Sequence, residues 1–208
     1  MFAPGAGRPL AAVAVVLGLV VGLVGTGVVP FSFAAVAALA VAAALWGFFA
    51  TFFRDPDRTP GPGIVSAADG RVRAVGVEGD RLRISVFMNV TNVHVNRFPL
   101  DATVDSVDTS GQGFRPAYAA DADHNVQRRY LLRTALGPVE VVQMTGIVAR
   151  RLVSFVRPGA TGRKGDRIGM IVLGSRVDVL LPAARAEAAV AVGDRVHAGE
   201  TTIARERA

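Results

Sequence analysis

Two kinds of side chain in this sequence could supply a base or a nucleophile: three histidines, and a serine that follows a glycine. The histidines are His94, His124 and His197, and none lies in an HxH or HExxH pattern that would place two metal ligands on one face. The chain has no cysteine, which excludes a thiolate zinc site, a disulfide framework and a cysteine nucleophile. A zinc hydrolase that uses all three histidines is the metal-dependent alternative that the residues leave open.

The serine of interest is Ser175, which follows Gly174 between two apolar runs. No GxSxG pattern is present, so a nucleophile elbow is not indicated. Glycine allows backbone conformations that other residues resist, so the Gly174 carbonyl could be exposed to the neighbouring hydroxyl. Taken alone, the dipeptide is more typical of a turn.

The elements that must position these groups begin with a long uncharged segment. Positions 9–53 contain no charged residue, whereas Arg8 precedes them and Arg54 follows. A bilayer core about 30 Å thick needs about 20 apolar helical residues for one crossing, so this segment is long enough for two. We expect a transmembrane helical hairpin over residues 1–53, with spans at about 10–29 and 31–53.

The residues beside the hairpin predict its orientation. Aromatic side chains crowd the end of the second span next to Arg54 and Arg58, as in an interfacial belt with a basic flank. Because Arg8 flanks the other open end, the positive-inside rule places both ends, and the domain that follows, on the cytoplasmic side of the cell membrane. A cleaved signal peptide is the alternative, and the second apolar run argues against it.

The remaining residues predict one mainly β domain. Residues 56–63 read PDRTPGPG, which cannot continue a helix, so 54–63 is interpreted as a linker and 64–208 as the domain. Apolar and alternating runs predict strands at 71–77, 81–88, 102–109, 127–134, 139–144, 168–172, 176–181 and 201–204. One short helix is expected around 147–155, and the strands are expected to form a closed or sandwiched sheet.

A short repeat within this domain narrows the fold class. GDRI at 165–168 and GDRV at 193–196 each lead into a short apolar segment, which resembles the hammerhead turns of lipoyl-like, barrel-sandwich folds. A lipoyl or biotinyl carrier is not indicated, because the single lysine, Lys164, lies in a glycine-rich loop.

The net charge of +6 comes almost wholly from arginine. The basic residues are scattered, with no RNP signature, helix-turn-helix pattern or basic aromatic run, so no nucleic-acid partner is expected. An anionic phospholipid membrane is the partner that fits the charge better.

Several segments, taken in order, resemble the phosphatidylserine decarboxylase proenzymes, and most closely the short, archaeal-type form with a hydrophobic hairpin in front. The resemblance covers residues 52–204, and its specificity lies in the ordered set, since each piece alone is weak. The pieces are FFRDP at 52–56, SAADG at 66–70, NVHVNR at 92–97, ARR at 149–151, GSRVD at 174–178 and AGET at 198–201.

The resemblance implies an enzyme that makes its own prosthetic group. The Ser175 hydroxyl would attack the Gly174 carbonyl, and cleavage between 174 and 175 would leave chains 1–174 and 175–208, held together without a covalent bond. Residue 175 would become a pyruvoyl group, which forms a Schiff base with the amine of phosphatidylserine and promotes loss of CO2 to give phosphatidylethanolamine. Neither PLP nor a metal is required.

The resemblance also implies roles for individual residues. Asp69 and His94 would join Ser175 in a maturation triad, and His94 could also act in decarboxylation. Longer family members carry a second histidine three positions after the first, where this chain has Arg97, so the identity of the base stays open. Arg97 and Arg115 are candidate substrate-binding residues, and Arg115 lies in a loop at 111–125 that could line the head-group entrance or simply be exposed.

A rival reading from another functional class is a non-catalytic, membrane-anchored barrel-sandwich binding module. It predicts one unbroken chain, whereas the lyase predicts two polypeptides. The sequence leaves open whether either form assembles into a homo-oligomer.

Overall fold

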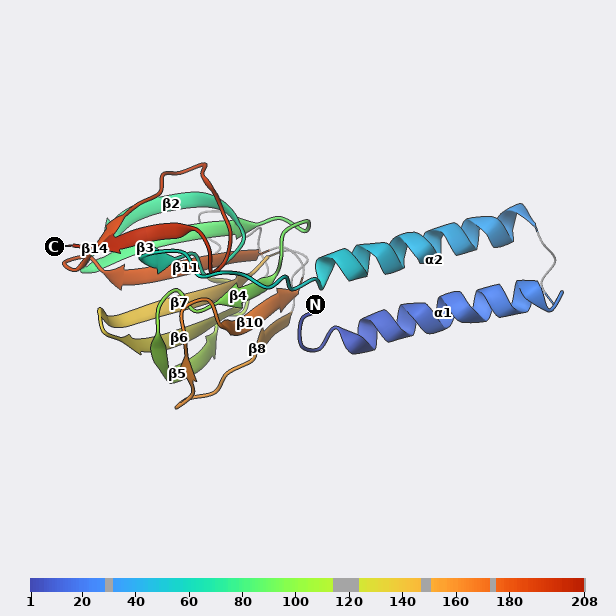
Figure 1. Cartoon of the computed structure of the whole chain (residues 1–208), viewed down its shortest axis with the longest axis horizontal. Coiled ribbons are helices and arrows are strands. Elements are labelled where there is room, and N and C mark those ends of the chain that lie inside the picture. Colours follow the sequence, from blue (N-terminus) through green and yellow to red (C-terminus); the bar gives the residue numbers. More distant parts are fainter. Residues whose placement is uncertain (29–31, 114–123, 147–150, 173–174, 208) are drawn as a thin grey trace. The chain divides into compact units, whose positions relative to one another are not determined.

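The computed structural model describes residues 1–28, 32–113, 124–146, 151–172 and 175–207. The chain divides into two compact units, Met1–Pro56 and Asp57–Ala208. The first unit is helical and the second is built from strands (Figure 1).

The first unit contains two apolar helices, α1 (Gly7–Gly25) and α2 (Phe33–Phe52), which contact each other. The side chain of Ser32 caps α2 by accepting a hydrogen bond from the Ala35 N–H at 3.3 Å. No residue of α1 is buried, and in α2 only Ala35, Ala42 and Phe52 are. Both helices are long and apolar enough to cross a membrane. The predicted pair of apolar N-terminal helices is therefore confirmed, with bounds that differ by a few residues.

The second unit is dominated by an eight-stranded antiparallel sheet. Its strands alternate between inward apolar and outward polar side chains, and Val72, Ile84, Val141 and Val179 are among the residues in the core beneath it. In spatial order the strands are β13 (Arg195–Val196), β2 (Gly70–Glu78), β3 (Arg81–Met88), β11 (Ser175–Pro182), β7 (Gly137–Thr145), β6 (Gln127–Thr134), β5 (Ala102–Ser110) and β9 (Thr161–Gly162).

Two three-stranded sheets complete the second unit. One has the order β1 (Ile64–Val65), β14 (Thr202–Glu206), β12 (Ala186–Ala188), and the other has the order β4 (Val95–Arg97), β10 (Arg167–Val172), β8 (Arg151–Ser154).

The mainly β prediction is confirmed, with two corrections. The short helix expected around 147–155 is wrong where it is described, because residues 151–154 form β8 and pair with β10. In the part of the chain that the structure describes, no sheet closes on itself, so of the two expected forms, a closed or a sandwiched sheet, the closed one is wrong.

The repeated GDR segments form two equivalent turns. In each turn the aspartate carboxylate accepts a hydrogen bond from the N–H three residues earlier, at 2.8 Å in the first and 2.9 Å in the second. The glycine carbonyl of the first turn accepts from Arg97 at 2.9 Å, and that of the second accepts from Arg71 at 3.0 Å. Both glycines adopt positive φ, +88° and +100°, which explains why glycine occupies them. The repeat therefore marks a recurring local structure.

Candidate functional site

Ser175 begins β11, a strand paired on both sides in the interior of the eight-stranded sheet. Its register partners are Met88, the last residue of β3, and Thr145, the last residue of β7. Ser175 is fully buried, and its hydroxyl donates a hydrogen bond to Met88 Sδ at 3.4 Å. The preceding strand, β10, ends at Val172 in a different sheet. Ser175 thus stands where the chain has passed from one sheet into another; Gly174 lies outside the described residues.

His94 lies directly before β4, beside the end of β10. Its backbone carbonyl accepts a hydrogen bond from the Ile171 N–H at 3.2 Å, and its ring is fully buried. The ring Nδ1 is 2.9 Å from the Asn92 carbonyl oxygen. A carbonyl can only accept, so Nδ1 carries the proton of the neutral ring and Nε2 holds the lone pair. In the neutral ring, Nε2 is therefore the basic atom of His94.

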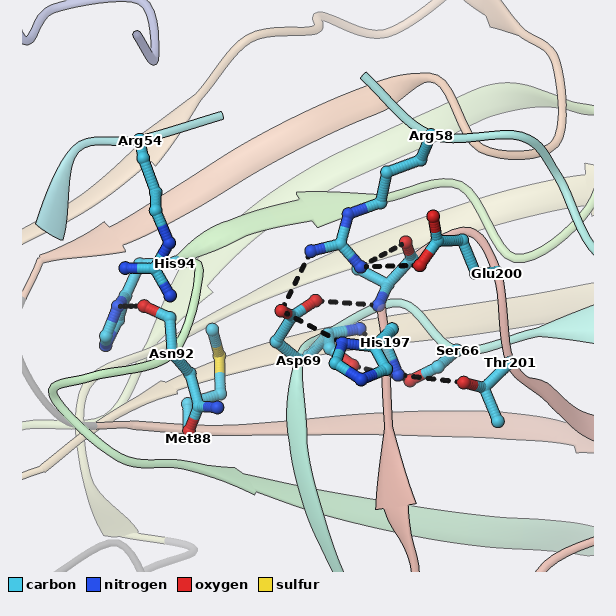
Figure 2. A network of polar contacts seen from close by, with 12 residues as sticks. Arg54, Arg58, Ser66, Asp69, Met88, Asn92, His94, His197, Glu200 and Thr201 are labelled. Carbon is cyan, nitrogen blue, oxygen red and sulfur yellow. Dashed lines mark hydrogen bonds and ion pairs between the residues drawn. The ribbon is translucent and has the colours of Figure 1, made fainter. Parts of the chain in front are cut away.

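Asp69 lies at the centre of a different cluster (Figure 2). Its Oδ2 accepts from Arg58 Nη2 at 2.9 Å, and its Oδ1 accepts from the Ala198 N–H at 2.8 Å. The Nδ1 atom of His197 is 3.6 Å from the same Oδ2. Both Asp69 and Arg58 have side chains only 5% and 6% exposed, whereas that of His197 is 61% exposed. The arrangement is a buried ion pair with one solvent-facing imidazole at its edge.

The structure therefore brings the three predicted maturation residues into one unit but not into one hydrogen-bonded triad. The described hydrogen bonds of Asp69 and of Ser175 do not include His94. His94 stands beside the strand that leads to Ser175, while Asp69 contacts His197 instead. The triad remains a prediction.

Of the two arginines predicted to bind substrate, the structure describes only Arg97. Arg97 is 5% exposed, and its Nη1 donates to the Gly165 carbonyl at 2.9 Å, which ties it to one of the two repeated turns. Arg115, with most of the loop at 111–125, lies outside the described residues. Near the end of that loop, Asn125 Nδ2 donates at 2.8 Å to the carbonyl of Thr145, the residue of β7 that pairs with Ser175.

Sequence reasoning missed Arg58 as a site residue, because it lies in the segment interpreted as a linker. Besides its contact with Asp69, its Nη1 lies 3.3 Å from the Ala198 carbonyl oxygen and 3.3 Å from Glu200 Oε2. The same segment is bonded to the domain through Gly61 N–H, which donates to the Gly199 carbonyl at 3.1 Å. No local signal in the sequence pairs Arg58 with Asp69 or Glu200, which lie 11 and 142 residues further along the chain.

A cleft of about 430 Å³ opens beside the Asp69 cluster and the strand end that holds Met88. Three arginines line it, Arg71, Arg73 and Arg195, together with His197, and none of the described lining residues is acidic. The guanidinium of Arg73 lies 5.5 Å from the centroid of the Phe87 ring, in cation–π geometry. The other lining residues are Gly70, Asn89, Thr91, Asn92 and Val196. The cleft is electrostatically suited to an anion.

Over the described part of the chain, no three His, Asp or Glu side chains are grouped so that they could hold a metal ion. The chemistry that this site offers is that of a buried hydroxyl, imidazoles, carboxylate and guanidinium groups.

Comparisons with known proteins place this geometry in a biochemical context. The family model described as Phosphatidylserine decarboxylase matches residues 45–204. A phosphatidylserine decarboxylase proenzyme of Thermobifida fusca is 47% identical over 165 residues, which cover 78% of this chain and 76% of that protein. A protein of Halobacterium salinarum named as a candidate archaetidylserine decarboxylase proenzyme is 45% identical, over 79% of this chain and 84% of that protein. A phosphatidylserine decarboxylase proenzyme of Streptomyces avermitilis is 43% identical, over 83% and 79%.

Proposed function

This chain belongs to the phosphatidylserine decarboxylase family, and on that premise we propose that it is a proenzyme that cleaves itself at Gly174-Ser175 and then converts phosphatidylserine to phosphatidylethanolamine and CO2. The observation that carries the proposal is the setting of Ser175: a fully buried hydroxyl on the first residue of an interior strand, directly after the step between two sheets. A nucleophile in such a position is held in one place and shielded from water.

The self-cleavage requires only groups of this chain and one water molecule. Attack of Ser175 Oγ on the Gly174 carbonyl carbon forms a C–O bond and breaks the peptide C–N bond, and the hydroxyl proton passes to the freed nitrogen. Loss of the Ser175 α-proton expels the Gly174 carboxylate and leaves a dehydroalanine. Its tautomer, an imine, takes up water and releases ammonia, so residue 175 becomes a pyruvoyl group.

The sheet pairing supports retention of both products as one domain. The piece 175–208 would contain β11, β13 and β14, which pair with β3 and β7, with β2, and with β1, respectively. All of these partner strands belong to the piece 1–174. Conversion of residue 175 to a pyruvoyl group removes only its own N–H, and the pairing of residues 176–182 with β3 and of 176–180 with β7 does not depend on the bond between 174 and 175.

The residues around position 175 fit the prosthetic group that the family uses. A pyruvoyl group there would supply a ketone that takes up the substrate amine as a Schiff base and accepts the electron pair left by CO2, without PLP. The chain's contribution is to bury residue 175 between β3 and β7 and to provide a base. His94, with its lone pair on Nε2, is the candidate that we assign to both proton transfers.

We assign the substrate head group to the arginine-lined cleft. Phosphatidylserine carries a phosphate and a carboxylate, and guanidinium groups bind both in a planar, bidentate fashion. Arg71, Arg73 and Arg195 supply such groups, and the lining residues that the structure describes include no opposing carboxylate. Arg115, predicted from the sequence, remains a further candidate.

A lipid substrate is consistent with the two apolar helices. We propose that α1 and α2 cross the cell membrane as a hairpin and that the β unit faces the cytoplasm, because Arg8 and Arg54 flank the two open ends. The hairpin would then keep the β unit close to phosphatidylserine head groups.

The test is the intact mass of the purified full chain and of a Ser175→Ala variant. The lyase predicts two polypeptides for the unsubstituted chain, the smaller one beginning with a blocked residue at 175, and a single chain of 21.7 kDa for the variant. Borohydride in the presence of phosphatidylserine should then fix the lipid amine to the smaller piece. If the unsubstituted chain stays whole, or if the variant is cut at the same bond, the proposal is wrong. The chain would then be the membrane-anchored binding module instead.

A further inference from the structure

A chain of buried polar side chains runs from Ser175 through the core. Ser175 Oγ donates to Met88 Sδ at 3.4 Å, and Asn96 Nδ2 donates to the same sulfur at 3.6 Å. Gln143 Nε2 donates to Asn96 Oδ1 at 2.8 Å, and the Tyr130 hydroxyl donates to Gln143 Oε1 at 3.1 Å. All five residues are fully buried. A connected run of polar groups in an otherwise apolar β core is uncommon and needs an explanation.

The hydrogen bonds of this run follow one another head to tail. Burial raises the pKa of the Tyr130 phenol, so it stays protonated, and its hydroxyl donates to Gln143 Oε1. Its donation requires the oxygen of the Gln143 amide to face it, which turns the Gln143 NH2 group toward the Asn96 oxygen. The Asn96 NH2 group must then face Met88. Flipping either amide would bring two donors or two acceptors together.

The run reaches Ser175 through Met88, whose side chain is flexible. Methionine has three rotatable side-chain bonds and a weakly accepting sulfur, so by itself it would not hold a neighbour in one orientation. The donor from Asn96 restricts the Met88 thioether, and the restricted thioether in turn orients the Ser175 hydroxyl. Because a thioether takes no proton at neutral pH, this contact orients the hydroxyl without removing the proton that the base must accept.

The same run also contacts the strand on the other side of the cleavage position. Gly169 of β10 leaves no room for a side chain: a Cβ there would lie 2.7 Å from the Tyr130 hydroxyl oxygen and 2.9 Å from Gln143 Nε2. β10 and β11 lie on either side of the predicted cleavage step. The polar run therefore packs against β10 at one end and bonds to the first residue of β11 at the other.

From this geometry we propose that Met88, Asn96, Gln143 and Tyr130 form a positioning network for self-cleavage. Met88 contacts the reacting oxygen, and the other three act through it. The network orients Ser175 Oγ for the step that forms the C–O bond to Gly174 and moves the hydroxyl proton to the nitrogen. The inference rests on the proposed self-cleavage, and it adds residues to which no role had been assigned.

The experiment compares Met88→Leu with Met144→Leu in the full-length proenzyme. Both methionines are buried in the same sheet, and leucine keeps the volume while removing the sulfur. Conversion to two chains is followed by intact mass after synchronised synthesis. We expect Met88→Leu to slow conversion about 10- to 100-fold and Met144→Leu to change it by less than about twofold, with both melting temperatures near that of the unsubstituted chain.

Hydroxylamine, which cleaves esters, identifies the affected step. If Met88→Leu slows ester formation, no ester accumulates and hydroxylamine will not speed conversion of this variant. If hydroxylamine does speed conversion, the network acts after ester formation and the inference is wrong.

Should Met88→Leu fail to fold, Tyr130→Phe replaces it, with a slowing of a few-fold expected. Normal conversion of a folded Met88→Leu or Tyr130→Phe variant overturns the inference alone, whereas an uncut unsubstituted chain overturns the proposed function.

Discussion

His94 and His197 each have one of the features expected of a catalytic base. His94 is buried, lies beside the strand that leads to Ser175, and has its tautomer set by the Asn92 carbonyl. His197 is solvent-facing but contacts the carboxylate of Asp69, which could orient it. At the scale of the residue, the two features therefore belong to different histidines. His94 lies near the proposed cleavage step, and His197 contacts an acidic partner.

Asparagine substitution at each histidine separates these roles. Asn places a donor where Nδ1 stands, so His94→Asn keeps the bond to the Asn92 carbonyl while removing the basic nitrogen. We expect self-cleavage to slow about 10²- to 10⁴-fold in His94→Asn, and to remain within about tenfold in His197→Asn. His124→Asn is the matched control. Intact mass over time reports the rates, and the reverse ranking would assign the base to the Asp69–His197 pair.

The arginines of the cleft should affect substrate binding but not maturation. Replacing Arg73 or Arg195 by Gln removes a charged donor from the lining, so we expect KM for phosphatidylserine in mixed micelles to rise about 3- to 10-fold with a smaller change in kcat. Self-cleavage should proceed as before. Arg157→Gln, at an exposed position outside the cleft, is the control. An unchanged KM in both cleft variants would place the head group elsewhere.

At the scale of the element, β10 packs closely against its neighbours beside the candidate site. It pairs with β4 on one side and β8 on the other, so it holds His94 and the β8 segment in register. At Gly169 the neighbouring strand β8 and the Tyr130 side chain approach so closely that a Cβ would lie 2.6 Å from the Val153 carbonyl oxygen. This position demands glycine for space rather than for backbone conformation.

Gly169→Ala should therefore be destabilising, in contrast to Gly76→Ala in β2. A Cβ at Gly76 meets nothing within 4 Å, so that variant should have a free energy of unfolding near the unsubstituted value. Overpacking at Gly169 should cost about 1–3 kcal/mol and slow self-cleavage as well. Denaturant unfolding of the Ser175→Ala background measures both variants on an uncut chain. Equal stabilities for the two would show that the packing at β10 relaxes.

At the scale of the whole molecule, the division of the chain falls between Pro56 and Asp57, inside the segment predicted as a linker. Residues from Arg58 onward bond to the β unit through Asp69, Ala198 and Gly199. A cut on the N-terminal side of Arg58 leaves the Asp69 ion pair intact, and a cut on its C-terminal side leaves Asp69 buried without that partner.

Two truncations test this division. A chain that begins at Asp57 should fold and cleave itself, but it should no longer sediment with phosphatidylserine vesicles, because both apolar helices are gone. A chain that begins at Ile64 should lose about 3–5 kcal/mol of stability, since removing one partner of a buried ion pair leaves an uncompensated charge. Thermal unfolding and sedimentation measure both. If the two truncated chains are equally stable, residues 57–63 act as a linker after all. If the chain that begins at Asp57 still binds vesicles, the β unit itself has membrane affinity.

Local patterns in the sequence determined most of the elements. The uncharged run at 9–53 was predicted as apolar helices. Period-two alternation predicted β3, and strand-like apolar runs predicted β6 and β11, each within a residue or two of the observed bounds. The ordered motifs also identified the family, and the resemblance that they carry is the basis for the proposed cleavage at Gly174-Ser175. Such features depend on residues close together in the chain, which is why the sequence alone reveals them.

Which side chains meet was decided only by the tertiary structure. Asp69 pairs with Arg58 and approaches His197, and Ser175 reaches a polar run that extends to Tyr130, across strands far apart in sequence. The alternation in β7 already turned Gln143 toward the core, but no local signal indicates that Asn96 and Tyr130 meet it there. Sheet order and register set those contacts, and they follow from the packing of the whole β unit rather than from any one segment.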